Sequence, residues 1–155
     1  MISCLCLAYG RPRLLEEAMQ SFLIQDYPNK ELIIVNDLAE QELRYEHPQV
    51  KIFNFKERLP THGEKRNKTV ELSSGEILTS WDDDDISLPW RLTQIAKAFD
   101  ENPNLGYFKP KKAWCDYGKH IVKPHQGKFF MQAAFSRKAF NDIGGYAKIN
   151  KGEDE

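Results

Sequence analysis

The stretch that decides the fold is "ISCLCLAYGRPRLLEEAMQSFLIQDYPNKELIIVND", residues 2–37. Its first six residues form a short apolar run, as a buried parallel strand does. After the break at "YGRP", the apolar residues at positions 15, 18, 19, 22 and 23 have the spacing of a helix with one apolar face. "ELIIVND", residues 31–37, predicts a second buried strand that ends in Asp37. A strand, a helix and another buried strand predict a parallel α/β unit.

The same alternation of strands and helices continues to residue 101. "VKIFNF" (50–55) and "EILTSW" (76–81) predict two more strands, and residues 63–74 predict a helix that stops at Gly75. Further on, Ser87 is expected to cap a helix that has Pro89 in its first turn. "NPNLGYF" begins another strand, "AWCDYGKHIVK" resembles a hairpin, and "SRKAFNDIGGY" predicts a short capped helix. The fold class is therefore α/β, with a mixed, mainly parallel sheet flanked by helices.

The composition is that of an ordinary soluble globular domain. The chain has 155 residues, of which 41% are hydrophobic and 29% charged, and its net charge of −1 gives no overall field that favours nucleic acid. No apolar run reaches the length of a bilayer span, and the N-terminus has no basic segment or cleavage site of a signal peptide. The three cysteines have neither a zinc nor a disulfide spacing. Reduced thiols favour the cytoplasm, or a peripheral position at the inner face of a membrane.

Four consecutive aspartates, residues 82–85, follow the fourth predicted strand. Ligands of parallel α/β sheets bind at the carboxyl ends of the strands, where Asp37 is also expected. A helix N-terminus stabilises one carboxylate by about 0.3–1 kcal/mol, whereas two carboxylates roughly 6 Å apart repel by ~3 kcal/mol at an effective dielectric of about 20. A hard divalent cation such as Mg²⁺ or Mn²⁺ would reverse that repulsion. From the aspartates alone, a metal site and a solvated acidic loop both stay open.

Two other acidic motifs fit poorly. A calcium loop that starts at Asp82 would need Gly and Glu where Ser87 and Thr93 stand. A haloacid-dehalogenase-type phosphatase also has Asp-x-Asp after a buried strand, with the first Asp as nucleophile. In that family the motif ends the first strand, whereas here it ends the fourth.

Three blocks, taken together and in order, resemble the nucleotide-sugar-dependent glycosyltransferases of family 2, which have the GT-A fold. "LAYGRPRLLEEAMQSFLIQDYPNKELIIVND" resembles the opening strand, turn, helix and second strand of that family. "GEKRNKTVELSSGEILTSWDDDDISLP" resembles its "R-N-x-G…G-E…D-x-D-D…P" block, and "IGGYAKINKGEDE" its "G-G-F…E-D" block. Each block is weak alone, but the resemblance covers nearly the whole chain.

The resemblance implies a nucleotide pocket at the first turn. Ala8, Tyr9 and Arg11 would frame the pocket, and Asp37 would accept hydrogen bonds from the base or ribose. The first turn departs from the family pattern, because Ala8 and its neighbours Leu7 and Gly10 replace the usual Thr, Pro and Asn. A strand-end turn residue is the simpler alternative for Asp37.

The second block supplies further expected site residues. Arg66 would lie near the base or the diphosphate, and Asn67 would support the loop. Lys65 and Lys68 are expected on an exposed helical face rather than in direct contact with a ligand.

The resemblance gives the aspartates separate roles. Counted back from Pro89, the family's D-x-D falls on residues 82–84. Asp84 would be the metal ligand, for Mn²⁺ or Mg²⁺, and Asp82 or Asp83 would face the ribose. Asp85 would cap the following helix or order the loop.

The third block carries the expected catalytic pair. Asp154 would be the general base that takes the proton of the acceptor hydroxyl, and Glu153 would replace it in that role or orient the acceptor. Direct attack would invert the anomeric carbon. A frayed acidic tail is the alternative for these residues. We expect a single domain over residues 1–155, with a nucleotide-binding half over 1–101 and the start of an acceptor-binding half, which looks incomplete, over 102–155.

The predicted function is transfer of a sugar from a nucleotide-diphosphate donor to a hydroxyl acceptor such as a glycan, as in polysaccharide biosynthesis. A UDP-sugar is favoured as donor, with GDP- and dTDP-sugars as alternatives. Two rival functions stay open. One is a non-catalytic module that binds nucleotide sugars, and the other is a metal-dependent phosphatase or nucleotidyltransferase.

Overall fold

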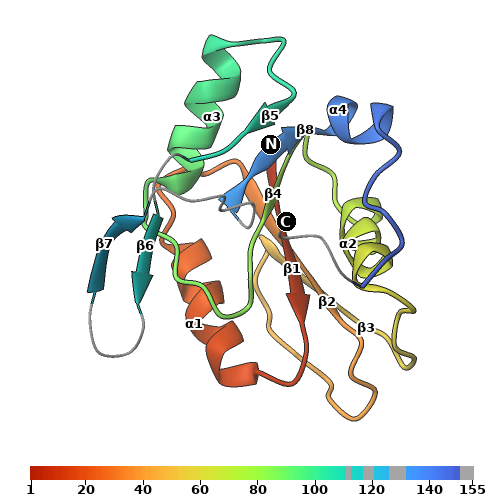
Figure 1. Ribbon diagram of the computed structural model, residues 1–155. Coiled ribbons are helices and arrows are strands. Elements are labelled where there is room, and N and C mark those ends of the chain that lie inside the picture. The colour runs from red at the N-terminus through yellow and green to blue at the C-terminus, as the bar shows by residue number, and fades with distance from the viewer. Residues whose placement is uncertain (111–112, 117–120, 126–131, 151–155) are drawn as a thin grey trace.

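A computed structural model of the chain describes residues 1–110, 113–116, 121–125 and 132–150 (Figure 1). The elements in chain order are β1 (Ile2–Ala8), α1 (Pro12–Leu23), β2 (Lys30–Asn36), β3 (Val50–Asn54), α2 (His62–Glu71), β4 (Ile77–Ser80), α3 (Arg91–Glu101), β5 (Tyr107–Phe108), β6 (Ala113–Asp116), β7 (Ile121–His125), β8 (Ala134–Ser136) and α4 (Arg137–Asp142). β6 and β7 pair with each other as an antiparallel hairpin, as the sequence predicts.

The main sheet has six strands in the order β3-β2-β1-β4-β8-β5. The first four run parallel, and Cys4 of β1 lies between Leu32 of β2 and Thr79 of β4 in the register. β8 is antiparallel to both β4 and β5. The predicted mixed, mainly parallel sheet is therefore confirmed.

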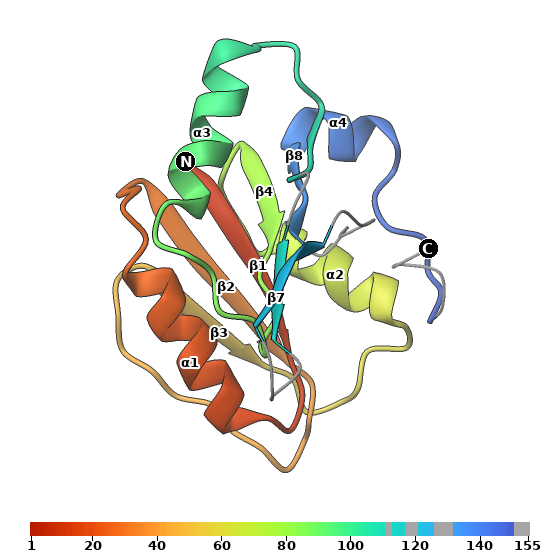
Figure 2. The same ribbon diagram turned by 60° about the vertical axis from the view of Figure 1, so that its left-hand side comes forward.

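Helices cover both faces of this sheet, and Figure 2 shows α1 and α2 on opposite sides of it. Alternate residues of β1 point to opposite faces. Cys4 and Cys6 belong to the core cluster that contains the buried residues of α1 and α3. Leu5 belongs to a second cluster with Val70 of α2 and Phe140 of α4. All of β2 is buried, as a central strand covered on both faces must be.

The start of α3 differs from the prediction. The helix begins at Arg91, so neither Ser87 nor Asp85 caps it. Ser87 is buried, and its hydroxyl accepts a hydrogen bond from Nη1 of Arg91 at 2.8 Å. The free N–H of Leu92 in the first turn donates instead to Oε1 of Gln25, at 3.2 Å. A cap from the segment after α1, far away in the chain, replaces the local cap, and no local sequence pattern indicates it.

A polar network fixes the edge of the sheet that lies at the amino ends of the strands. Glu31 is buried, and its carboxylate accepts from Ser3 Oγ at 2.7 Å, the Ser74 N–H at 2.6 Å and Lys51 Nζ at 2.8 Å. The Gly75 N–H donates to Ser3 Oγ at 2.8 Å, and a Cβ on Gly75 would lie 2.8 Å from the Ser3 backbone nitrogen. The glycine at the predicted helix stop is therefore required by a close backbone approach.

No helix within the described part of the chain is long and apolar enough to cross a bilayer.

Candidate functional site

The candidate site lies where β1, β2 and β4 end, at one edge of the sheet. The parallel register brings Ala8 beside Asn36, so Tyr9 and Asp37 follow neighbouring strand ends. β4 ends at Ser80 and leads directly into the aspartates. The residues that the sequence predicts for the nucleotide and the metal thus converge at this edge, as expected for a parallel α/β sheet.

Arg11 joins the first turn to the aspartate loop, residues 81–87. Gly10 has a φ of 69°, a left-handed conformation that lets the chain turn sharply between β1 and α1. The turn directs the Arg11 guanidinium at the aspartates. Its Nε and Nη2 donate to both oxygens of Asp83, and its Nη1 donates to Oδ2 of Asp84 at 2.5 Å. One guanidinium therefore compensates two carboxylates.

Asp83 and Asp84 differ in exposure. The Asp83 side chain is 2% exposed, and that of Asp84 is 41% exposed. Burial raises the pKa of Asp83, while Arg11 and the backbone N–H of Tyr9 oppose that rise. Asp83 thus holds the first turn against the aspartate loop, and Asp84 is the more accessible of the two carboxylates.

Arg91 lies on the inner side of the same loop. Its Nη2 donates to the Ser80 carbonyl at 2.7 Å and to Thr79 Oγ1 at 3.2 Å, and its guanidinium stacks on the Trp81 ring, 4.8 Å from the ring centre. Together with the Ser87 contact, these bonds connect both ends of the loop to one side chain.

The positive charge of Arg91 affects the pKa values of Asp82 and Asp85. Burial raises the pKa of Asp82 to about 6, and the positive charges of Arg66 and Arg91 counteract that rise. Burial also raises the pKa of Asp85, with Asp84 adding to the shift and Arg91 opposing it. The repulsion among the four aspartates is therefore reduced from two sides, by Arg11 at the surface and by Arg91 within.

The position of Lys65 differs from the prediction. It was expected on an exposed helical face, but its side chain is only 6% exposed. Its Nζ donates to Oδ1 of Asp37 at 2.5 Å and to the Ala8 carbonyl at 2.8 Å, and it lies 5.6 Å from the centre of the Tyr9 ring. Oδ2 of Asp37 accepts from the Leu59 N–H at 3.1 Å. Asp37 is therefore buried, and both of its oxygens are engaged.

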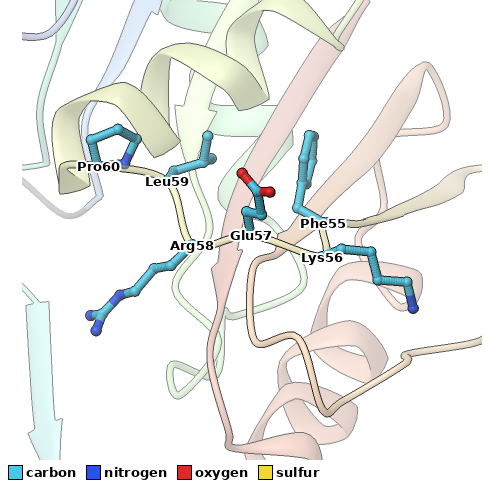
Figure 3. Close-up of a pocket in the computed structure, with 6 residues that line it drawn as sticks. All are labelled: Phe55, Lys56, Glu57, Arg58, Leu59 and Pro60. Atoms are coloured by element: carbon cyan, nitrogen blue, oxygen red, sulfur yellow. The ribbon is translucent and has the colours of Figure 1, made fainter.

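A depression with charged side chains of both signs is formed by a loop that reaches Tyr9 through Arg58. Residues 55–60, the loop that follows β3, line a pocket of about 450 Å³. Figure 3 shows the side chains of Arg58 and Lys56 pointing in opposite directions from this loop. The Arg58 guanidinium lies 4.8 Å from the centre of the Tyr9 ring, which is 41% exposed as a residue. An exposed aromatic ring beside the Arg58 guanidinium offers a stacking surface and positive charge to an anionic ligand.

Residues 144–150 pack against α2. Asn67 brackets the backbone of Tyr146, since its Nδ2 donates to the Tyr146 carbonyl and its Oδ1 accepts the Tyr146 N–H, both at 2.9 Å. The Arg66 guanidinium lies 5.6 Å from the centre of the Tyr146 ring. The Gly63 N–H donates to the carbonyl of Ile149 at 3.3 Å. Asn67 thus holds the backbone of Tyr146 against α2.

Two parts of the prediction cannot be placed. Glu153 and Asp154 lie outside the described residues. The positive charge of Arg66 opposes the rise that burial causes in the pKa of Asp82, and its guanidinium lies over the Tyr146 ring. Its contact with a ligand stays a prediction.

Sequence analysis missed two residues that organise the site, Lys65 and Arg91. A signal existed for Arg91, which stands four residues before the buried Ile95 and so falls on the apolar face of α3. For Lys65 the helical pattern is too polar to give one.

The residues present fit a divalent cation of the kind that retains water. Within the described ranges, no three His, Cys, Asp or Glu side chains gather into a complete metal cage. Mg²⁺ and Mn²⁺ sites do not require such a cage, because one or two carboxylates plus substrate phosphates suffice for Mg²⁺ and Mn²⁺ accepts similar oxygen ligands. Asp84, whose side chain is 41% exposed and is held by Arg11, carries an oxygen ligand of this kind.

Residues 3–152 match the family model described as "Glycosyl transferase family 2". The chain belongs to this family. A phosphatase of the haloacid-dehalogenase type is thereby set aside. An uncharacterized glycosyltransferase of Methanocaldococcus jannaschii is 29% identical, and the match covers 83% of this chain and 48% of that protein. The chain thus spans about half the length of this relative.

Solved structures agree with the fold of a family 2 glycosyltransferase. Residues 1–349 of S. aureus TarS superpose with a TM-score of 0.75 at 16% identity, over 99% of this chain and 52% of that one. The mannosyltransferase PcManGT of Pyrobaculum calidifontis, in complex with GDP-Man and Mn²⁺, gives a TM-score of 0.70 at 20% identity, over 95% of this chain and 47% of that one. The GT-A fold expected from the sequence is confirmed.

Proposed function

We propose that this chain binds a nucleotide-diphosphate sugar at the carboxyl ends of β1, β2 and β4 and takes part in transfer of the sugar to a hydroxyl acceptor. The observation that carries the proposal is the convergence of Tyr9, Arg11, Asp37 and Asp84 at that edge of the sheet. Membership of glycosyl transferase family 2 supports the reaction class.

A UDP-sugar is the favoured donor, with GDP- and dTDP-sugars as alternatives. Similar folds have been solved with UDP, with UDP-GlcNAc and with GDP-Man. In this chain the base would stack near Tyr9, where Arg58 and Lys65 place positive charge. Asp37 would accept an N–H of the base or an O–H of the ribose with the lone pairs that Lys65 and Leu59 leave open.

The diphosphate would be held at the aspartate loop. Arg11 would leave Asp84 and turn its fork-shaped guanidinium to the phosphate oxygens, for which bidentate geometry is suited. Asp84 would then be free to hold Mn²⁺ or Mg²⁺. Bound there, the cation would neutralise negative charge that develops on the diphosphate. Asp82 and Asp83 would face the ribose side.

The acceptor hydroxyl would lose its proton to Asp154, with Glu153 orienting the acceptor or replacing Asp154 as base. The hydroxyl oxygen would form a bond to the anomeric carbon as the bond to the diphosphate oxygen breaks. The electron pair of that bond would leave with the diphosphate, and the anomeric carbon would be inverted.

Calorimetric titration tests the proposal. UDP, GDP and dTDP, and their common sugar conjugates, are titrated into the protein with Mn²⁺, with Mg²⁺ and with EDTA. Cation-dependent binding of at least one nucleotide sugar is expected, and the absence of any such binding would refute the proposal. Release of the nucleotide diphosphate is then followed with simple glycan acceptors. Donor binding without release would identify a non-catalytic nucleotide-sugar-binding module.

A further inference from the structure

We propose that Arg91 is a positioning residue for the donor, because it fixes both ends of the aspartate loop and holds a positive charge beneath it. The inference rests on the donor binding proposed above. Arg91 itself touches no ligand in this scheme, because it lies on the inner side of the loop. Its effect on the donor would pass through the aspartates that it positions.

The contacts of Arg91 form a brace across the loop. Ser80 is the last residue of β4, and Ser87 follows the aspartates, so the two contacts lie seven residues apart in the chain. The two Nη atoms of one planar group reach these two ends, and the distance between the ends is thereby fixed. Trp81, the first residue of the loop, is 1% exposed and stacks on the same guanidinium.

A second set of contacts holds the far side of the loop. Gln25, in the segment that follows α1, donates from Nε2 to the Leu88 carbonyl at 2.9 Å and accepts the Leu92 N–H through Oε1. The Asp26 N–H donates to the Pro89 carbonyl at 2.9 Å. Residues 88–92 are therefore held by the segment that follows α1. Within the span from residue 81 to residue 86, Arg11 holds Asp83 and Asp84, and Arg91 bridges the two ends of the loop.

Burial of an arginine costs free energy that packing alone does not require. A buried cation loses its hydration, and apolar residues of similar volume often give equal or greater stability. Nε of Arg91 is buried and makes no hydrogen bond within the described part of the chain, so the site does not satisfy this cation completely. A requirement for the positive charge itself explains why an arginine is buried here. The charge lies next to Asp82 and Asp85 and reduces the repulsion between the acidic residues of the loop.

Arg137 offers a matched control at the opposite edge of the sheet. Like Arg91 it binds main-chain and hydroxyl oxygens, but it uses all three of its nitrogens, donating from Nε to the Gly75 carbonyl at 2.8 Å, from Nη1 to the Val70 carbonyl at 3.2 Å and from Nη2 to Ser73 Oγ at 2.8 Å. It is a structural brace of the same kind, but it lies away from the aspartates. A lysine at either position keeps the charge and loses the planar fork.

The experiment compares Arg91→Lys with Arg137→Lys in the full chain. Three quantities are measured: the melting temperature, hydrogen exchange of a peptide covering residues 81–90 without ligand, and the affinity for the nucleotide diphosphate with Mn²⁺. We expect both variants to melt at a lower temperature. Only Arg91→Lys should accelerate exchange in the aspartate loop and weaken nucleotide binding, by about tenfold or more, since a small loss of geometry at a charged site is costly. Arg137→Lys should stay within about twofold of the parent affinity.

Ser87→Ala provides a second test that keeps the arginine and removes one end of the brace. It should accelerate loop exchange and weaken nucleotide binding less than Arg91→Lys does. If Arg91→Lys fails to fold, Ser87→Ala and Thr79→Val carry the comparison. Unchanged loop exchange in these variants, or equal loss of affinity in the Arg137→Lys control, would overturn the inference. A parent protein that binds no nucleotide would instead refute the proposed function, while loop exchange would still decide whether Arg91 orders the loop.

Discussion

Lys65 of α2 donates to the Asp37 carboxylate at 2.5 Å while also donating to the carbonyl of Ala8 at 2.8 Å. One ammonium group thus links a helix to the ends of two neighbouring strands. Both side chains of the ion pair are almost completely buried. Breaking this buried ion pair is therefore strongly destabilising. The pair fixes Asp37 where the donor is proposed to bind.

Lys65→Met should destabilise the fold by about 3–5 kcal/mol, because it leaves the buried Asp37 carboxylate without its counter-charge. Chemical denaturation monitors this change. The control is Lys68→Met on the same helix, which removes only the contact with the exposed Glu71 and should cost less than about 1 kcal/mol. The double variant Asp37→Asn with Lys65→Met should recover much of the lost stability. A double variant as unstable as the sum of the two single variants would contradict this account of the pair.

Arg11→Gln should change cation and nucleotide binding in opposite directions. Removing the guanidinium frees Asp84, so Mn²⁺ should bind the nucleotide-free protein about three- to tenfold more tightly. Nucleotide diphosphate should bind more weakly, because the proposed phosphate contact is lost. Calorimetry measures both affinities.

Arg13→Gln is the control for Arg11→Gln, since it removes the same charge two residues further on, at an exposed position. It should leave both affinities nearly unchanged. A Mn²⁺ affinity that is the same in Arg11→Gln and in the parent protein would show that Asp84 is not the cation ligand.

Glu31→Gln should reduce stability at neutral pH but matter little in acid. Burial would raise the pKa of Glu31, but its bonds with Lys51, Ser3 and Ser74 outweigh this effect and leave the pKa below the usual 4.5. A lowered folded-state pKa gives stability that is present above pH 4.5 and is lost as the pH falls through the folded value. We expect a loss of about 1–3 kcal/mol at pH 7 that shrinks progressively below pH 4.5. Denaturation curves over that pH range test it, and a loss independent of pH would argue against the charge.

Gly63→Ala should disturb transfer more than donor binding. A Cβ at this position would lie 1.8 Å from the Ala147 carbonyl oxygen, so the backbone of residues 147–149 would have to move. Overpacking of this kind costs about 1–3 kcal/mol. Because residues 144–150 lead to Glu153 and Asp154, release of nucleotide diphosphate with an acceptor should fall while nucleotide affinity is retained. Gly106→Ala, whose nearest contact is the Ala139 Cβ at 3.2 Å, is the control.

The sequence predicted the parts of the fold that depend on local periodicity. The strands around Cys4 and Ile33 and the apolar face of α1 follow from spacing alone, because burial on one face or on both leaves a regular pattern. The start of α3 could not be predicted, since its cap comes from Gln25, which lies 67 residues before Leu92 in the chain.

The candidate site was predicted as a set of residues but not as a set of contacts. Residue type and order place Arg11, Asp37 and Asp84 at one edge of the sheet. They do not reveal that Arg11 already occupies Asp84 or that Lys65 already occupies Asp37, because such pairings depend on side chains from elements far apart in the chain. Lys65 was expected at the surface for the same reason, because a lysine is rarely buried unless it is paired and its partner could not be recognised from the sequence.

Lys65 and Asn67 lie two residues apart on α2, a helix of 10 residues. One holds the carboxylate that follows β2, and the other holds the backbone of Tyr146 in the segment that runs towards the C-terminus. Both attachments share a single rigid element, so a displacement of α2 at one attachment is transmitted to the other. The attachment of α2 to the proposed donor site and its attachment to the last described residues are therefore only two residues apart.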